Sequence, residues 1–263
     1  GTYGPPVLAP DNVMMAATLA EGITIIESAA AEPEVLDLAN FLNAMGAKIQ
    51  GAGTRRIVIE GVKELHGVEH TVIPDRIEAG PFMGAAALAG EGVTLRRICR
   101  DHMKVITEAI VASGHRVDFN EAGDTCTIHR SEDTKGCDIV TSPYPGYPTD
   151  MQAQMTALLA TTPGISVIKD TIFPQRFMHC SELKRMGADI KVDNGTAVVR
   201  GVAHLSPPPV MAPDLRASAA LVLAALNAKG STEISRLYHI DRGYEHIDEK
   251  LIMLGANVER VKD

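Results

Sequence analysis

Small apolar residues gather into helical stretches along the chain, and a glycine and then a β-branched run follow each one. The first stretch is Met14–Ala20, which is followed by Gly22 and the run Ile23–Ile26. Comparable stretches recur at Met83–Leu88, Met155–Leu159 and Ala217–Leu226. Stretches of this kind predict buried helices, and β-branched residues favour strands. The pattern therefore predicts a helix–strand unit that occurs four times.

A second, amphipathic helix follows each β-branched run, and in the first copy Leu36, Leu38, Phe41 and Leu42 mark it. A second glycine closes this helix, and an alternating strand with a hairpin partner comes next. Glycine suits the left-handed turn that ends a helix. The two glycines of each copy lie 22 to 25 residues apart: Gly22 and Gly46, Gly92 and Gly114, Gly164 and Gly187, Gly230 and Gly255.

An aspartate shortly after a proline precedes each small-residue helix, namely Asp11, Asp75, Asp150 and Asp214. A carboxylate there accepts hydrogen bonds from the free N–H groups of a helix start, so the spacing predicts helix caps. The whole chain is therefore predicted to be an α/β (α+β) protein of four helix–strand–helix–strand–strand units. The last unit stops at a strand over residues 257–261, whose hairpin partner is expected to come from elsewhere.

Composition narrows the class of protein. The 263 residues carry a formal net charge of −8 without a basic block, which argues against nucleic acid as a partner. No apolar run approaches the roughly 18 residues of a membrane span, and the N-terminus lacks a signal-peptide pattern. The four cysteines show no CxxC spacing, which favours a reduced, cytoplasmic protein. His66 and His70 are expected to be surface or packing residues, and neither a metal nor an organic cofactor is implied.

Seven strings of residues resemble the UDP-N-acetylglucosamine 1-carboxyvinyltransferase family of enolpyruvyl transferases, from about Asn12 to Lys262. The strings are Met15–Gly22, Glu32–Glu34, Pro74–Glu78, Pro148–Gln154, Arg176–His179, Asp214–Ser218 and His239–Glu245. The resemblance implies an inside-out α/β barrel of two domains with three units each. Residues 1–72 would then be a single unit of the first domain, and residues 73–263 the complete second domain.

The resemblance also implies an activity, the first committed step of peptidoglycan synthesis. The enolpyruvyl group of phosphoenolpyruvate moves to the 3′-hydroxyl of UDP-N-acetylglucosamine, and phosphate is released. This chemistry needs a base near the hydroxyl and cations for the phosphate and carboxylate groups. The chain would be an incomplete portion of the enzyme that acts with its N-terminal part or a complementing chain.

Asp150 is the residue that the resemblance places beside the sugar hydroxyl, as the base. From the sequence alone, the same aspartate could simply cap a helix. Arg176, Arg216 and Arg242 are the candidates for the anion cluster, with Arg242 given a catalytic role, because guanidinium groups bind phosphate and carboxylate. Any one of these arginines could instead be a solvated surface residue.

Three further residues are candidates for substrate binding: Asp214, Val7 and Ile172. For Ile172, a contact to the uridine part and a place in a strand core are equally good interpretations.

The sequence departs from the family at several positions. Where the family has Lys, Ser and Gly on the nucleotide phosphates, this chain has Gly4, Pro6 and Leu8, and only Val7 fits. Pro174 replaces an acidic residue. None of the four cysteines matches the reactive cysteine of the family, and Cys126 and Cys180 are expected to be buried thiols.

Two other functions stay open. One is a non-catalytic protein, derived from this fold, that binds nucleotide sugars or regulates another protein. The other is a 3-phosphoshikimate enolpyruvyl transferase, which shares the fold and the arginine chemistry, although the seven strings match the UDP-sugar branch better.

Overall fold

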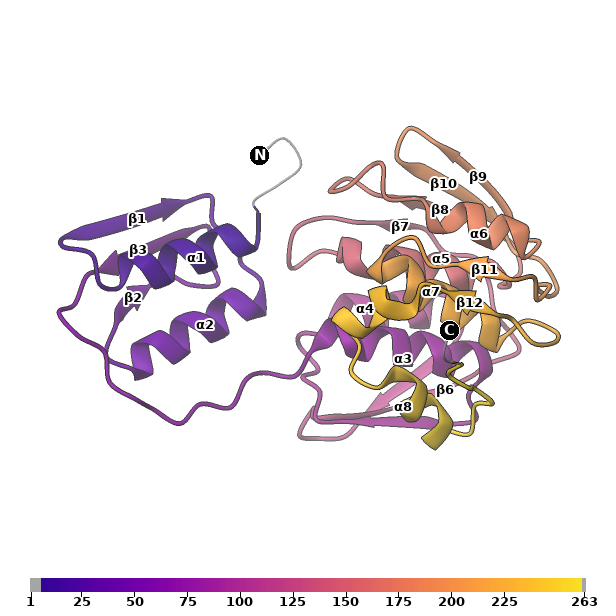
Figure 1. The fold of residues 1–263 in the computed structure, drawn as a ribbon, viewed down its shortest axis with the longest axis horizontal. Helices are drawn as coiled ribbons and strands as arrows, with labels where there is room; N and C mark the ends of the chain where they lie inside the picture. Colours follow the sequence, from indigo (N-terminus) through magenta and orange to yellow (C-terminus); the bar gives the residue numbers. More distant parts are fainter. Residues whose placement is uncertain (1–5, 262–263) are drawn as a thin grey trace. The chain divides into compact units, whose positions relative to one another are not determined.

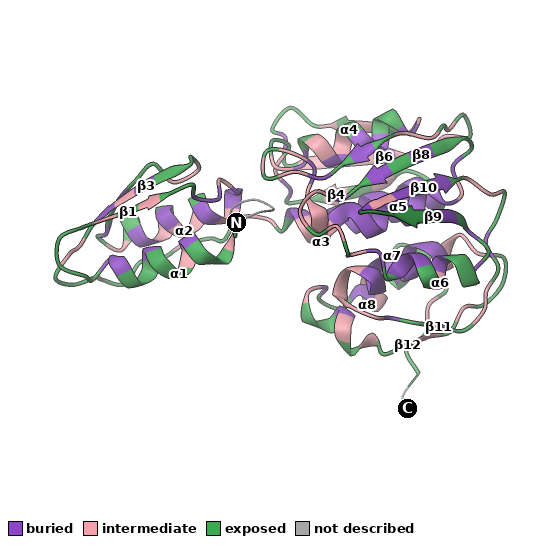
Figure 2. Ribbon diagram, turned by 90° about the horizontal axis from the view of Figure 1, so that it is seen from above, coloured by how far each residue is buried: buried purple, intermediate pink, exposed green. Residues whose placement is uncertain are grey.

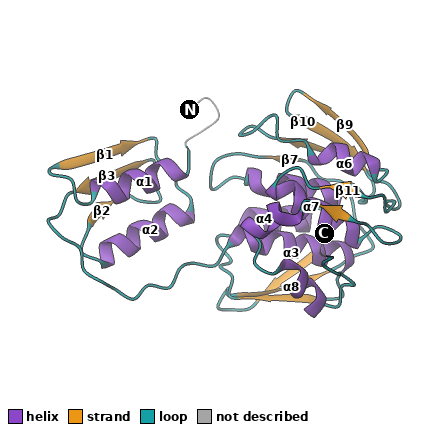
Figure 3. Cartoon of the chain, viewed as in Figure 1, coloured by secondary structure: helices purple, strands orange, loops and turns teal. Residues whose placement is uncertain are grey.

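The computed structural model describes residues 6–261, and the chain divides into two compact units (Figure 1). The first unit comprises the residues up to Pro74 together with the segment Ser142–Pro148. The second comprises Asp75–Thr141 and the residues from Thr149 onward. Both units combine helices with β-sheet, so the chain is an α/β protein, as the sequence predicted (Figure 3).

The first unit is a three-stranded antiparallel sheet with two helices packed on it. Its strand order is β1-β3-β2, and β3 pairs with both neighbours. Met14, Val35, Ile57 and Ile59 are fully buried in its core. The elements in chain order are α1 (Leu8–Ala17), β1 (Ile23–Glu27), α2 (Pro33–Ala44), β2 (Lys48–Gln50) and β3 (Arg56–Glu60).

The second unit contains three separate sheets. Their strand orders are β4-β6-β5, β7-β8-β10-β9 and β11-β12. Its first elements are α3 (Arg76–Ala89), β4 (Val93–Arg96), α4 (Lys104–Ala112), β5 (Arg116–Phe119), β6 (Thr125–His129) and β7 (Ile139–Val140). Next come η1 (Thr149–Met151), α5 (Gln152–Leu159), β8 (Ile165–Lys169), α6 (His179–Arg185), β9 (Asp189–Asp193) and β10 (Thr196–Arg200). The last are β11 (Val210–Met211), α7 (Leu215–Leu226), β12 (Ile234–Ser235), η2 (Leu237–Arg242) and α8 (Ile247–Met253).

The core of the second unit is made of helices. Helices α3, α5 and α7 contact one another, and every residue of α5 is buried (Figure 2). Small residues such as Ala157 and Ala220 let these helices approach closely, because they add little bulk between the helix axes. Strands β8 and β10, by contrast, alternate between buried and exposed side chains, so one face of their sheet is open to solvent. Helix α5 is therefore enclosed by its neighbours.

The predicted glycine pattern is confirmed in its backbone geometry. All eight of the spaced glycines have positive φ, with values from 86° to 126°. Gly114 shows why another residue would not fit, since its φ is +103° and a Cβ atom there would lie 2.4 Å from the carbonyl oxygen of Asp133. The order helix, strand, helix, strand, strand is observed for α1–β3, for α3–β6 and for α5–β10, with β7 and η1 before α5.

The structure corrects the sequence predictions for Asp11 and for residues 257–261. Asp11 does not cap a helix, because α1 begins at Leu8 and takes Asp11 into its first turn. Residues 257–261 do not form a strand. No strand of the described residues pairs with them, and Arg260 instead forms ion pairs with Asp241 and Asp248. An extended segment without a pairing neighbour makes no ladder hydrogen bonds. Within residues 6–261, no helix is long and apolar enough to span a bilayer.

Candidate active site

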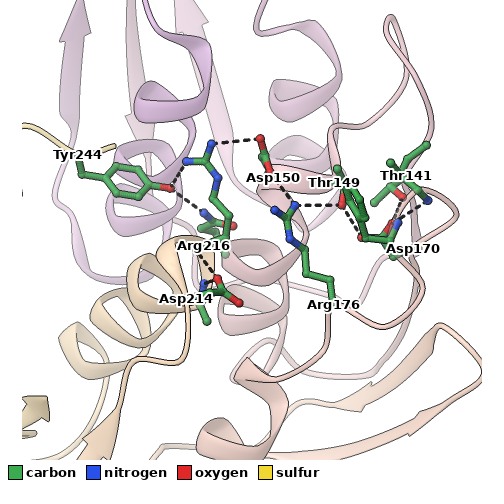
Figure 4. Close-up of polar contacts among 12 residues, drawn as sticks. Thr141, Thr149, Asp150, Asp170, Arg176, Asp214, Arg216 and Tyr244 are labelled. Carbon is green, nitrogen blue, oxygen red and sulfur yellow. Dashed lines mark hydrogen bonds and ion pairs between the residues drawn. The ribbon is translucent and has the colours of Figure 1, made fainter. Parts of the chain in front are cut away.

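Asp150 lies in η1, directly before α5, and its carboxylate binds two arginines (Figure 4). Arg176 Nη1 donates a hydrogen bond to Oδ1 at 2.7 Å, and Arg216 Nη2 donates one to Oδ2 at 3.1 Å. A guanidinium has five N–H donors, so either arginine can hold Asp150 and still contact another anion. The structure thus brings three of the predicted site residues together. The capping alternative for Asp150 is wrong, because α5 has Met151 at its N-cap and no side-chain cap.

Opposing effects set the pKa of Asp150. Burial raises the pKa, but Arg216 and then Arg176 lower it through charge and hydrogen bonds, and the pKa ends below the usual 3.8. The Asp150 side chain is nevertheless 33% exposed. Asp150 is therefore an ionised carboxylate at neutral pH that a ligand can still reach.

Arg216 is fixed from a second direction by Tyr244. Its Nη1 donates a hydrogen bond to the Tyr244 hydroxyl at 3.1 Å, and Gln154 Nε2 donates to the same oxygen at 3.1 Å. Tyr244 is only 1% exposed, and burial raises its pKa, so the phenol stays neutral. The guanidinium of Arg216 thus joins the phenol of Tyr244 to the carboxylate of Asp150.

Asp214 caps helix α7 and thereby places Arg216. Its Oδ1 accepts hydrogen bonds from the backbone N–H groups of Arg216 and Ala217, at 2.8 and 2.9 Å. The predicted caps at Asp75 and Asp214 are both confirmed. Asp214 therefore supports the arginine through the backbone, and Arg216 projects from the first turn of the helix.

Arg176 and Ile172 both lie in the loop between β8 and α6. Arg176 Cζ is 5.0 Å from the ring centroid of Phe173, within the range of a cation–π contact. Ile172 is half-buried and follows Asp170 outside the strand, so its placement in a strand core is wrong. Pro174 is half-buried in the same loop.

Arg242 is not joined to the Asp150 cluster by any hydrogen bond or ion pair found among residues 6–261. It ends η2 and lines an open pocket of about 530 Å³ in the second unit. Asp75, Glu78 and Tyr244 also line this pocket. Tyr244 therefore belongs to both places, since it contacts Arg216 and borders the pocket that contains Arg242.

Val7 belongs to the first unit, where it is half-buried just before α1 and packs against the core of that unit. Leu8 is 73% exposed and begins α1, and Pro6 is exposed. Gly4 lies outside the described residues. Val7 therefore belongs to the first unit, whereas the other predicted site residues all belong to the second unit.

The buried cysteines are confirmed as packing residues. Burial raises the pKa of Cys126 to about 11 and that of Cys180 to about 12. Both thiols are therefore protonated at neutral pH and poor nucleophiles. Among residues 6–261, no group of three or more His, Cys, Asp or Glu residues is arranged to hold a metal ion.

His179 is a buried neutral group beside the cluster, and it gives a test of the local electrostatics. Burial, opposed by Asp214, lowers the pKa of His179 from 6.5 to about 4. The unfolded chain therefore binds a proton as the pH falls below 6.5, while the folded protein does not until about pH 4, so stability is lost over this range.

Between pH 7 and pH 5, the wild-type protein should lose about 2 kcal/mol more free energy of unfolding than the variant His179→Gln. Urea unfolding at the two pH values measures the difference. Equal losses in the two proteins would show that folding does not lower the pKa of His179.

Sequence reasoning missed Tyr244, Gln154 and Asp170. Gln154 is a polar residue in a helix predicted to be buried, which is a signal for a buried hydrogen bond, but its partner lies 90 residues away. Asp170 directly follows the β-branched run of β8, and nothing in the local pattern distinguishes it from a turn residue.

Comparison with known proteins shows the family to which the sequence is similar. The sequence profile of the EPSP synthase (3-phosphoshikimate 1-carboxyvinyltransferase) family matches residues 5–251. The chain is 73% identical over all 263 residues to a UDP-N-acetylglucosamine 1-carboxyvinyltransferase of Akkermansia muciniphila, of which it covers 62%. It is 55% identical over 260 residues, 98% of its length, to UDP-N-acetylglucosamine 1-carboxyvinyltransferase 2 of Carboxydothermus hydrogenoformans, again covering 62% of that protein. The chain thus spans about 62% of the length of these curated relatives.

Two solved structures share the fold. The enolpyruvyl transferase NikO from Streptomyces tendae has a TM-score of 0.86 at 28% identity, over 97% of this chain and 61% of NikO. An EPSP synthase from Acinetobacter baumannii has a TM-score of 0.77 at 20% identity, over 95% of this chain and 60% of that one, and shows the fold alone.

Proposed function

The chain belongs to the EPSP synthase family, and from this premise we propose that it forms part of an enzyme that transfers an enolpyruvyl group. The donor is phosphoenolpyruvate, the acceptor is the 3′-hydroxyl of UDP-N-acetylglucosamine, and phosphate is released. The names of relatives 73% and 55% identical to the chain support this choice of acceptor. The role in peptidoglycan synthesis and cell shape, and the cytoplasmic location, belong to the same proposal.

The observation that carries the proposal is a partly exposed carboxylate held between two arginines. Asp150 accepts the proton of the sugar hydroxyl while the hydroxyl oxygen bonds to C2 of phosphoenolpyruvate, and a general acid donates a proton to the methylene carbon. The tetrahedral adduct then loses a methyl proton and phosphate, which restores the double bond. Arg176 and Arg216 bind the negative groups of the substrates, which suits their paired placement on Asp150.

Substrate binding prepares Asp150 for this role. Without a ligand, the two arginines hold the pKa of Asp150 below its usual value, which makes the carboxylate a weak base. A bound anion competes for the same guanidinium groups and weakens their pull on Asp150. The pKa of Asp150 therefore rises when substrate is present, and the carboxylate becomes a better proton acceptor.

The remaining predicted residues take supporting roles in the proposal. Ile172 contacts the uridine part, and Arg242 binds an anionic group from its pocket. Asp214 acts by placing Arg216. Val7 is a contact to the nucleotide. We also propose that the buried helices of the second unit and its solvent-facing sheets form the inside-out α/β barrel, with residues 73–263 as one domain of three units and residues 1–72 as a single unit of another.

The test is phosphate release from phosphoenolpyruvate and UDP-N-acetylglucosamine. We expect turnover when the chain is supplied with the part of the Akkermansia relative that it does not match, since the chain spans only about 62% of that protein. We expect no turnover by the chain alone. Calorimetric titration that finds tight binding of the UDP-sugar without turnover in the supplied protein would favour the non-catalytic alternative instead.

A further inference from the structure

A carboxylate outside the arginine cluster lies at the centre of a second hydrogen-bond network. Asp170 follows β8 directly and is only 1% exposed. Its Oδ1 accepts a hydrogen bond from the Thr141 hydroxyl at 2.8 Å, and its Oδ2 accepts one from the Thr149 hydroxyl at 2.6 Å. A buried carboxylate costs free energy unless hydrogen-bond donors satisfy its oxygens, so the stability of this arrangement depends on its donors.

Two backbone groups complete the network. The N–H groups of Ile172 and Phe173 donate to Asp170 Oδ1 at 2.9 and 2.8 Å. The direction of the Thr141 bond is also fixed, because Thr171 N–H donates to the Thr141 hydroxyl oxygen at 3.0 Å and leaves the Thr141 proton for Asp170. Four donors therefore converge on one carboxylate, two from hydroxyl groups and two from the backbone.

The donors come from three parts of the chain, and two of these parts also carry residues of the candidate active site (Figure 4). Thr149 is the residue immediately before Asp150, and Arg176 Nη1 lies 3.4 Å from the Thr149 hydroxyl oxygen. Ile172 and Phe173 belong to the loop that carries Arg176, and Arg176 stacks on Phe173. Asp170 thus connects the segment that contains Asp150 to the loop that contains Arg176.

We propose that Asp170 is a positioning residue, which holds Ile172 and Arg176 in register with Asp150. This inference rests on the proposed function, and it assigns Asp170 to the recognition of the nucleotide sugar. The carboxylate reaches no substrate itself, because Asp170 is only 1% exposed. It acts by fixing the loop through Ile172 and Phe173, and by fixing Asp150 through Thr149.

The variant Asp170→Asn tests this role in the protein that turns over in the assay above. An amide keeps one oxygen for the Thr141 and backbone donors, but its N–H₂ group faces the Thr149 hydroxyl and removes an acceptor. We expect the KM for UDP-N-acetylglucosamine to rise about tenfold or more, with kcat lowered less than about threefold, because misplacement of a binding group by about 1 Å is costly. Asp189→Asn removes an exposed carboxylate of the same unit and should leave both constants unchanged.

A second pair of variants keeps the charge of Asp170 intact. Thr149→Val removes the hydroxyl donor and should raise the KM, whereas Thr149→Ser keeps it and should restore the wild-type KM. Combined with Asp170→Asn, Thr149→Val should add little, because both changes break the same bond.

The outcomes separate the two proposals. If the wild-type protein turns over and the KM of Asp170→Asn and Thr149→Val stays within about twofold of wild type, the positioning role is overturned and the proposed function stands. Loss of kcat together with a lowered unfolding midpoint, equally in Thr149→Val and Thr149→Ser, also overturns it, since that result assigns the network to stability alone. A wild-type protein without turnover contradicts the proposed function itself.

Discussion

Asp150→Asn should lower kcat for phosphate release about 100-fold or more in the completed protein, which is the chain supplied with the part of the Akkermansia relative that it does not match. The substitution preserves the shape of the side chain and removes its ability to accept a proton, and a positioned base contributes roughly 10²- to 10⁴-fold to a rate. The wild-type rate should also rise with pH as Asp150 loses its proton, and this acidic limb should be absent from the profile of the variant. Rates at saturating substrate between pH 4 and pH 8 measure both effects, because bound substrate raises the pKa of Asp150.

The matched control for this substitution is Asp189→Asn, which neutralises an exposed aspartate whose partner is Arg200. Its kcat should stay within about twofold of wild type, as is usual for a surface change. If Asp150→Asn keeps more than about one tenth of the wild-type kcat, Asp150 is not the base.

Arg216→Lys should lower kcat/KM about 100-fold, although it keeps the positive charge. Arg216 uses two nitrogen atoms to contact Tyr244 and Asp150 at the same time, each at 3.1 Å. A lysine side chain is shorter and ends in a single ammonium group, so it cannot contact Tyr244 and Asp150 at the same time. Loss of a charge-assisted hydrogen bond in a buried site costs about 3 kcal/mol. Because Arg216 is the stronger of the two cationic influences on Asp150, the pKa of Asp150 should rise in the variant, and the acidic limb of the rate should move to higher pH.

Arg185→Lys is the matched control for Arg216→Lys, since Arg185 is an exposed arginine of α6 that forms an ion pair with Glu182. It should leave kcat/KM and the pH profile unchanged. If Arg216→Lys keeps kcat/KM within about threefold of wild type, a positive charge is sufficient at this position and the two simultaneous guanidinium contacts are not required.

The periodic features of the fold could be predicted from the sequence because each has a local cause. A glycine is needed wherever the backbone takes a positive φ, so the spaced glycines mark the element ends. The caps at Asp75 and Asp214 follow from the same local chemistry. Asp11 and Asp150 have similar sequence contexts but do not cap, because the boundary of a helix depends on the packing around it as well as on the residue at its start.

The site could be predicted only in part, for a related reason. Asp150, Arg176 and Arg216 stand out by residue type and by resemblance, and the structure brings them together. The groups that hold them are contributed by distant segments. Tyr244 meets Gln154 across 90 residues, and Thr149 meets Asp170 across 21. No local pattern contains such pairs, because tertiary packing creates them.

The most direct test of the central proposal is the choice of acceptor. The completed protein is given phosphoenolpyruvate with either UDP-N-acetylglucosamine or 3-phosphoshikimate, and released phosphate is measured. We predict sustained phosphate release with UDP-N-acetylglucosamine, its loss in the Asp150→Asn protein, and none above background with 3-phosphoshikimate. Phosphate release with 3-phosphoshikimate and not with UDP-N-acetylglucosamine would contradict the proposed function.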